Sequence, residues 1–213
     1  MPSRSGQTMS NTLQGAQFVL AAHRVSQLPA DHGAEVAFAG RSNAGKSSAL
    51  NALTGHKGLA RTSKTPGRTQ QMVAFALPAT VADEPWRLID LPGYGYAKVP
   101  EELRAHWKQE IDAYLHRRQS LRGVVLIADI RHPLKEFDRM MLDFCFATGL
   151  PCHLLLTKAD KLSRNQAAQA LAAMRKSFPD GLHATAQVFS SPAGTGVEEA
   201  RERVAELLRT PRE

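Results

Sequence analysis

The chain has 213 residues, with 27 Lys and Arg against 20 Asp and Glu, and a formal net charge of +7. Its length suits one domain with a sizeable core, and 43% hydrophobic with 22% charged residues excludes a mostly disordered chain. Its apolar runs are far shorter than the roughly 20 residues of a membrane-spanning helix, so no membrane partner is expected.

The two ends of the chain look unstructured, and the N-terminus lacks the apolar core of a secretion signal. We therefore expect a cytoplasmic protein with a flexible extension over residues 1–15, one domain over 16–209 and a short tail over 210–213. Cys145 and Cys152 have no metal-binding spacing and are expected to be reduced and buried.

The predicted strands alternate with longer segments of helical periodicity. Helices are expected to begin near residues 46, 101, 135, 163 and 197. This order predicts an α/β fold in three layers, with a mostly parallel sheet between helices. Only eight residues, 78–85, join the second and third strands, which predicts an antiparallel hairpin at one edge. The expected sheet has six strands, one of them an antiparallel edge strand: 36–39, 72–77, 86–90, 123–129, 153–157 and 186–189.

A phosphate-binding loop is the strongest motif. The pattern G-x-x-x-x-G-K-S follows the first predicted strand and opens the first predicted helix. In such a loop backbone N–H groups face the phosphates, the lysine reaches the β and γ phosphates, and the serine hydroxyl binds Mg²⁺. The alternative, a glycine-rich turn without a ligand, is disfavoured by this context. The expected contacts are Gly40, Arg41, Ser42, Asn43, Ala44, Gly45, Lys46, Ser47 and Ser48.

Three weaker motifs follow at the ends of later strands. The first is Asp90, Leu91, Pro92 and Gly93, where a carboxylate can hold the water shell of Mg²⁺ and a glycine N–H can face the γ phosphate. Taken alone, it also fits an ordinary turn.

The second weak motif is Thr157, Lys158, Ala159 and Asp160. The Asp160 carboxylate can accept from both guanine donors, while the Lys158 stem covers the purine face. In isolation an exposed charge pair explains this motif equally well.

The third weak motif, Phe189, Ser190 and Ser191, follows the last strand. The motifs are stronger evidence in combination, because all follow the carboxyl ends of predicted strands, where ligands of open α/β sheets bind. Their order is typical of guanine-nucleotide contacts. Pro192 has no N–H, which puts a further contact with the base in doubt.

The motifs together resemble the EngB family of bacterial GTPases. The resemblance spans about residues 18–208 and includes the segments 40–48, 65–70, 90–97, 129–133 and 157–161. It implies a Ras-like P-loop GTPase domain that binds GTP or GDP. It also implies a cytoplasmic role in assembly of the large (50S) ribosomal subunit, in a family also named as needed for cell division and septation.

Positions carried over from the family give roles to individual residues. The resemblance makes Ser47 and Thr69 the Mg²⁺ ligands, with Thr65 as a rival for the second place, and adds Gly67 and Arg68 to the nucleotide contacts. The residues expected to support hydrolysis are Lys46, Thr69, Asp90 and Gly93.

Tyr94 stands where Ras-type enzymes have the glutamine that orients water. Slow hydrolysis is therefore expected unless a partner or cation assists. Related GTPases without that glutamine can use an asparagine at the position of Asn43 to hold K⁺, although a loop-stabilising amide explains Asn43 equally well.

The basic charge is concentrated between Glu35 and Asp83, a stretch without acidic residues. It suggests a phosphate-rich partner, here the rRNA of the large-subunit precursor, or a solvated loop without one. We expect a monomer that acts as a switch. A P-loop kinase or ATPase and an inert RNA-docking module remain as alternatives. The six basic residues are Arg41, Lys46, Lys57, Arg61, Lys64 and Arg68.

Overall fold

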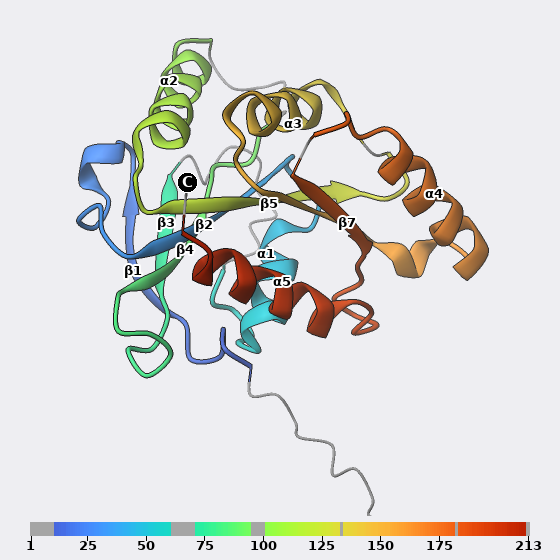
Figure 1. Ribbon diagram of the computed structural model, residues 1–213, viewed down its shortest axis with the longest axis horizontal. Coiled ribbons are helices and arrows are strands. Elements are labelled where there is room, and N and C mark those ends of the chain that lie inside the picture. Colours follow the sequence, from blue (N-terminus) through green and yellow to red (C-terminus); the bar gives the residue numbers. More distant parts are fainter. Residues whose placement is uncertain (1–10, 61–70, 95–100, 133, 182, 212–213) are drawn as a thin grey trace, which may run out of the picture.

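The structure is a computed structural model that describes residues 11–60, 71–94, 101–132, 134–181 and 183–211. A seven-stranded sheet forms its middle layer, in the spatial order β1-β3-β4-β2-β5-β6-β7 (Figure 1). β3 is antiparallel to both of its neighbours, and the other pairs of the order are parallel. The strands are β1 (Gln17–Ala22), β2 (Ala34–Gly40), β3 (Met72–Ala76), β4 (Trp86–Asp90), β5 (Leu121–Asp129), β6 (Cys152–Thr157) and β7 (Ala184–Val188).

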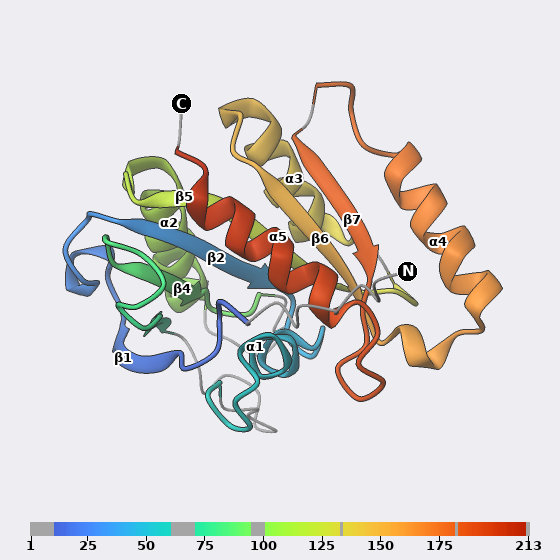
Figure 2. The ribbon, with the colours of Figure 1, turned by 60° about the horizontal axis from the view of Figure 1, so that its bottom comes forward.

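Helices cover both faces of the sheet. One apolar core joins one face to α2, α3 and α4, and a second core joins the other face to α1 and α5 (Figures 1 and 2). The central strands β2, β5 and β6 are almost wholly buried, as is typical of parallel strands covered by helices on both faces. The helices are α1 (Lys46–Thr54), α2 (Glu101–Arg117), α3 (Glu136–Thr148), α4 (Arg164–Lys176) and α5 (Val197–Arg209), with short 3₁₀ turns η1 (Val25–Gln27) and η2 (Ala159–Lys161).

The predicted α/β fold class is confirmed, and so is the antiparallel β3–β4 hairpin. The prediction of six strands missed β1, which lies outside β3 and makes β3 the second strand from the edge. β1 is hard to recognise because most of its side chains are exposed and its register with β3 shifts between Phe18 and Leu20. Such a shift interrupts the alternation by which a strand is predicted.

The segment assigned to the N-terminal extension includes a packed part. Leu13 is completely buried against the core shared by α1 and α5. The Asn11 side-chain amide donates to the Leu53 carbonyl at 3.0 Å. In the described part of the chain, none of the helices has the length and apolar character needed to cross a membrane.

Candidate nucleotide-binding site

The predicted motifs meet at the carboxyl ends of the parallel strands. β2 leads directly into the loop before α1, and Figure 2 shows the tip of its arrow close to that helix. Asp90 ends β4, and Thr157 ends β6. Ser190 lies just beyond β7. The structure thus brings the phosphate-loop and base motifs to one edge of the sheet.

Glycine is required at two positions of the phosphate loop. A Cβ at Gly40 would lie 2.7 Å from the Ile127 carbonyl oxygen, so a side chain would collide with the backbone of β5. Gly45 has φ of +100° and caps α1, which starts at Lys46. The loop therefore directs the N-terminal amides and the positive end of the helix dipole into the site, as anion binding requires.

One side chain from β6 supports the phosphate loop, and three serines belong to the loop and the first turn of α1. The Thr157 hydroxyl donates to the Ala44 carbonyl, which ties the loop to β6. Ser42 contributes a buried hydroxyl without a hydrogen-bond partner among the described residues. Ser47 and Ser48 lie in the first turn of α1, where Ser48 is exposed.

Lys46 and Asp90 form an ion pair between α1 and the end of β4. Both side chains are largely buried, with exposed fractions of 12% and 9%. Burial raises the pKa of Asp90, and the Lys46 ammonium opposes that rise. The main predicted phosphate-binding cation and the predicted carboxylate of the Mg²⁺ shell are therefore in direct contact.

Gly93 and Tyr94 pack against the phosphate loop. A Cβ at Gly93 would be 3.5 Å from the Ser42 nitrogen, and the Ser42 N–H donates to the Tyr94 carbonyl at 2.9 Å. The phenol of Tyr94 donates to Asp138 at 2.8 Å, and its ring packs on Phe137. Burial and the Asp138 carboxylate raise the pKa of Tyr94 well above its usual value. The Tyr94 side chain is thus engaged by α3.

On the base side, Lys158 connects two parts of the site. Its backbone is left-handed, with φ of +59°, and its ammonium donates to the Asn43 carbonyl at 2.7 Å. Asp160, on η2, accepts from the Ser190 hydroxyl at 2.7 Å. That hydroxyl, together with Lys161, lowers the pKa of Asp160. Asp160 is therefore a carboxylate held in place while remaining exposed to solvent.

The segment after β7 has mixed contacts. Phe189 is buried, and its carbonyl accepts from the Ala159 N–H at 3.1 Å. The Ser190 N–H donates to the Thr195 carbonyl at 3.0 Å, whereas Ser191 is half-buried beside it. The Ser190 amide is therefore already used within the loop.

Two further carboxylates lie at this edge, and neither was given a role from the sequence motifs. Asp129 ends β5 and contacts both Lys158 and Arg131, and Asp138 contacts Tyr94 and Arg41. Asp129 could have been noticed as a carboxylate at the end of a long buried strand. No local pattern would have indicated Asp138, which depends on the packing of α3.

Three predicted residues, Gly67, Arg68 and Thr69, lie outside the described residues, as does the rival Thr65. Among the described residues there is no cluster of three His, Cys, Asp or Glu side chains able to hold a metal ion. Ser47 is therefore the member of the predicted Mg²⁺ pair that the structure describes.

The fold and the loop between β2 and α1 define a P-loop GTPase domain. A model of the 50S ribosome-binding GTPase family matches residues 35–158, more than half of the chain. The chain belongs to the EngB family of GTP-binding proteins within that class.

Known EngB proteins are similar to this chain over nearly its whole length. A "probable GTP-binding protein EngB" from Stenotrophomonas maltophilia (strain K279a) is 57% identical over 195 residues, covering 91% of this chain and 95% of that protein. Its namesake from Xylella fastidiosa (strain 9a5c) is also 57% identical over 195 residues, covering 90% and 93%. A crystal structure of a probable GTP-binding protein engB shares the fold, with a TM-score of 0.65 and 24% identity over 83% of this chain and 99% of that chain.

Proposed function

We propose that this protein binds GTP and GDP with Mg²⁺ and hydrolyses GTP slowly to GDP and phosphate. The observation that carries the proposal is the bond from Lys158 to Asn43, which joins the base motif to the phosphate loop. Asp160, whose pKa is lowered, lies two residues after Lys158, at the carboxyl-end edge of the sheet where Lys46 also lies. A carboxylate that stays ionised suits recognition of the two donors of guanine.

The phosphate contacts come from the loop and the turn after β4. We assign the cradle to residues 40–48, contact with the β and γ phosphates to Lys46, and the γ-phosphate amide to Gly93. A triphosphate would compete with Asp90 for Lys46, because the two side chains form an ion pair. We add Leu91 and Pro92 from the turn, Gly67 and Arg68 from outside the described residues, and Thr157, Lys158, Ala159, Phe189, Ser190 and Ser191 around the base.

The available donors fit Mg²⁺. Ser47 follows Lys46 in α1, Lys46 contacts Asp90, and hydroxyl and carboxylate oxygens are the ligands this cation prefers. We assign Ser47 and Thr69 as ligands, with Asp90 holding the water shell. The bound ion neutralises charge on the β and γ phosphates. In this assignment Ser47→Ala removes the Mg²⁺ dependence of GTP affinity.

Exchange of one atom in the base site tests the proposal. Asp160→Asn converts an acceptor into a mixed donor and acceptor, so GTP affinity should fall by about 100-fold and affinity for xanthosine triphosphate should rise. Competition of labelled GTP by ATP is the companion measurement. Preference for ATP would favour a kinase or ATPase, and tight GTP binding without any turnover would favour an inert docking module. Unchanged GTP selectivity in Asp160→Asn contradicts the base assignment.

We further propose that the protein is a monomeric cytoplasmic switch in assembly of the large ribosomal subunit, with an effect on cell division and septation. The family description names 50S ribosome binding, and the net charge of +7 suits an RNA partner. Lys57 is exposed after α1, and its basic companions Arg61, Lys64 and Arg68 lie outside the described residues.

Sedimentation of lysate with GTP, GDP or a non-hydrolysable analogue tests the partner and the switch together. The protein should follow the 50S particle preferentially with GTP. Reversal of Lys57, Arg61 and Lys64 to Glu should weaken that association and flatten its salt dependence, with GTP affinity nearly unchanged. Association that ignores both the nucleotide and these charges would contradict the proposed switch and docking surface.

A further inference from the structure

Asp129 holds a buried carboxylate with an unusual number of charged partners. It is the last residue of β5, lies beside Thr157 in the parallel register with β6, and has a side chain only 7% exposed. Its oxygens accept from the Arg131 N–H at 3.0 Å, from the Arg131 guanidinium at 3.0 and 2.8 Å, and from Lys158 at 2.9 Å. The Arg131 guanidinium, supported by Lys158, holds the pKa of Asp129 far below its usual range.

The ammonium of Lys158 is consequently held from two directions. One donor position is used by the Asn43 carbonyl of the phosphate loop and another by Asp129. The Lys158 backbone is also fixed in a left-handed conformation at the end of β6. The Lys158 side chain is therefore fixed at its backbone and at its ammonium, with the aliphatic stem between these two points.

Arg131 keeps the carboxylate in the orientation that meets Lys158. It engages both Asp129 oxygens through its side chain, which leaves the Oδ2 edge shared between Arg131 and Lys158. A planar guanidinium fork fixes a carboxylate in a way that a lysine does not. The Arg131 side chain binds Asp129 although it is itself 41% exposed.

We propose that Asp129 is a positioning residue for guanine-nucleotide binding, acting through Lys158. By holding the ammonium, it orders the stem that covers the purine face before the nucleotide arrives. Ordering a lysine side chain costs conformational entropy, and a side chain that is ordered beforehand removes that cost from nucleotide binding. The inference rests on the proposed nucleotide site and adds to it a residue in β5.

A double-mutant cycle between Asp129 and Lys158 tests the coupling, with fluorescent N-methylanthraniloyl GDP as the probe. Asp129→Asn places an amide where Arg131 and Lys158 both donate, and Lys158→Met keeps the stem but removes the ammonium. Each should weaken GDP binding by about 10-fold. The double variant should bind no more weakly than the weaker single one, because both changes remove the same interaction.

A control variant and a second test variant separate a positioning role of Asp129 from a general effect on stability. Asp31→Asn alters a carboxylate at the amino ends of the strands, and its effect on GDP affinity should combine additively with that of Lys158→Met.

Arg131→Met leaves the Asp129 carboxylate in place and removes the guanidinium that binds it. It should weaken GDP binding by a few-fold in the wild type and have no effect in the Lys158→Met background. This variant gives the same test if Asp129→Asn does not fold.

The outcomes distinguish a failure of the proposed nucleotide site from a failure of the role of Asp129. Wild-type protein that fails to bind GDP contradicts the proposed function. Wild-type binding combined with unchanged affinity in Asp129→Asn, or with losses that multiply in the double variant, overturns the role of Asp129 alone. A lower melting temperature with unaltered GDP affinity would make Asp129 purely structural.

Discussion

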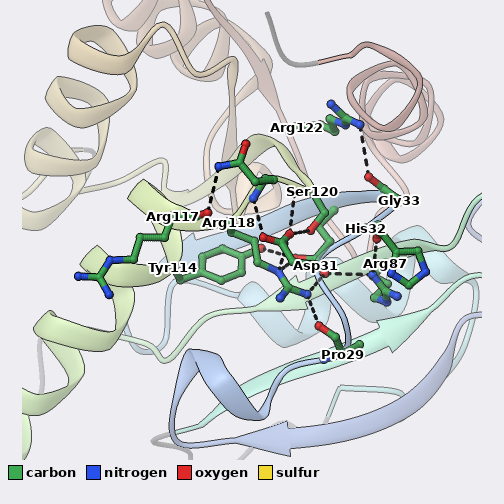
Figure 3. A network of polar contacts seen from close by, with 12 residues as sticks. Pro29, Asp31, His32, Gly33, Arg87, Tyr114, Arg117, Arg118, Ser120 and Arg122 are labelled. Atoms are coloured by element: carbon green, nitrogen blue, oxygen red, sulfur yellow. Dashed lines mark hydrogen bonds and ion pairs between the residues drawn. The ribbon is translucent and has the colours of Figure 1, made fainter.

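Charged side chains gather at both ends of the parallel strands, but the two groups are bonded differently. At the amino ends, Glu35 of β2 is fully buried and accepts from Arg118 at 2.7 and 3.0 Å, from Arg87 at 3.3 Å and from Tyr114 at 3.2 Å. Figure 3 shows Tyr114 and Arg118, from the end of the α2 region, turned toward Asp31 and Arg87. At the carboxyl ends, Asp160 and Lys158 remain partly exposed.

Groups of the same chain supply the hydrogen-bond partners of the amino-end network. Arg118 also donates to the Pro29 carbonyl, and Asp31 accepts from the Ser120 N–H and hydroxyl. Burial and the Glu35 carboxylate raise the pKa of Tyr114 well above its usual value. Residue type alone therefore does not separate a structural cluster from a binding site. Glu35 differs from Asp160 and Lys158 because it is completely buried and its hydrogen bonds come from its own chain, which leaves no access for a ligand.

Removal of the central carboxylate of the closed network should have the largest effect on stability. Glu35→Ala leaves Arg87 and Arg118 as buried charges without their main partner, so unfolding should become easier by about 3–5 kcal/mol. Urea denaturation measures this loss. Glu198→Ala, which removes an exposed partner of Arg201, should change stability by less than about 0.5 kcal/mol. A loss for Glu35→Ala as small as that of the control would show that the network is not a stabilising one.

The corresponding change at the carboxyl ends should affect nucleotide binding more than stability. Lys46→Ala removes the main cation for the β and γ phosphates, so GTP affinity should fall by about 100- to 1000-fold. Titration calorimetry gives the affinity. Unfolding without nucleotide should be affected less than in Glu35→Ala, because Lys46→Ala breaks one ion pair whereas Glu35 accepts from three side chains. If Lys46→Ala unfolds readily but binds GTP normally when folded, the two ends of the strands do not differ as described.

A buried histidine extends the comparison to pH. His153 of β6 accepts from Thr185 and donates to Gln187, and burial, aided by Arg203 and Arg175, lowers its pKa to about 4. The unfolded chain takes up this proton near pH 6.5, so stability is fully present above that pH and falls as the pH drops toward 4. Between pH 7.5 and 5 the loss from this group should be about 2 kcal/mol.

The measurement compares unfolding free energies of the wild type and His153→Gln at these two pH values. The variant should lose less stability on acidification, because it lacks the titrating ring. Equal losses in both proteins would mean that His153 is not responsible, and that other groups set the acid sensitivity of the strands.

The smallest expected effect concerns a cation at the phosphate loop. Asn43 has φ of +61° and an exposed side chain beside the bond from Lys158. We propose that it helps to hold K⁺ near the phosphates, so GTP hydrolysis should be several-fold faster in K⁺ than in Na⁺. Asn43→Ala should lose that difference. Equal rates of the wild type in the two salts would leave Asn43 as a loop-stabilising amide.

Much of the fold followed from the sequence where the signal is local. The strand expected over 123–129 corresponds to β5, and the eight residues 78–85 predicted the β3–β4 hairpin. A helix was expected to begin near residue 163, and α4 does begin there, with the Ser163 hydroxyl accepting from the Gln166 N–H at its cap. β1 was missed because its pairing with β3 spans about 55 residues and its side chains show little alternation.

The candidate site divides in the same way. The phosphate loop could be predicted because Gly40, Gly45 and Lys46 meet backbone and charge requirements within eight residues of one another. The contact of Asp129 with Lys158 and the contacts of Asp138 could not be predicted, because in each of them the partner side chain follows a different strand. Tyr94 was recognised as an exception to the glutamine rule, but only α3 decides that its phenol bonds Asp138.

The sequence by itself determined the α/β order, the phosphate loop and the family, since these depend on periodicity and short spacings. Tertiary structure decided which charges are closed off and which stay available. Glu35 meets Arg118 across 83 positions, and Lys158 meets Asn43 across 115. Such contacts depend on the register of neighbouring strands and on helix packing, and burial then sets the energetic weight of each charge.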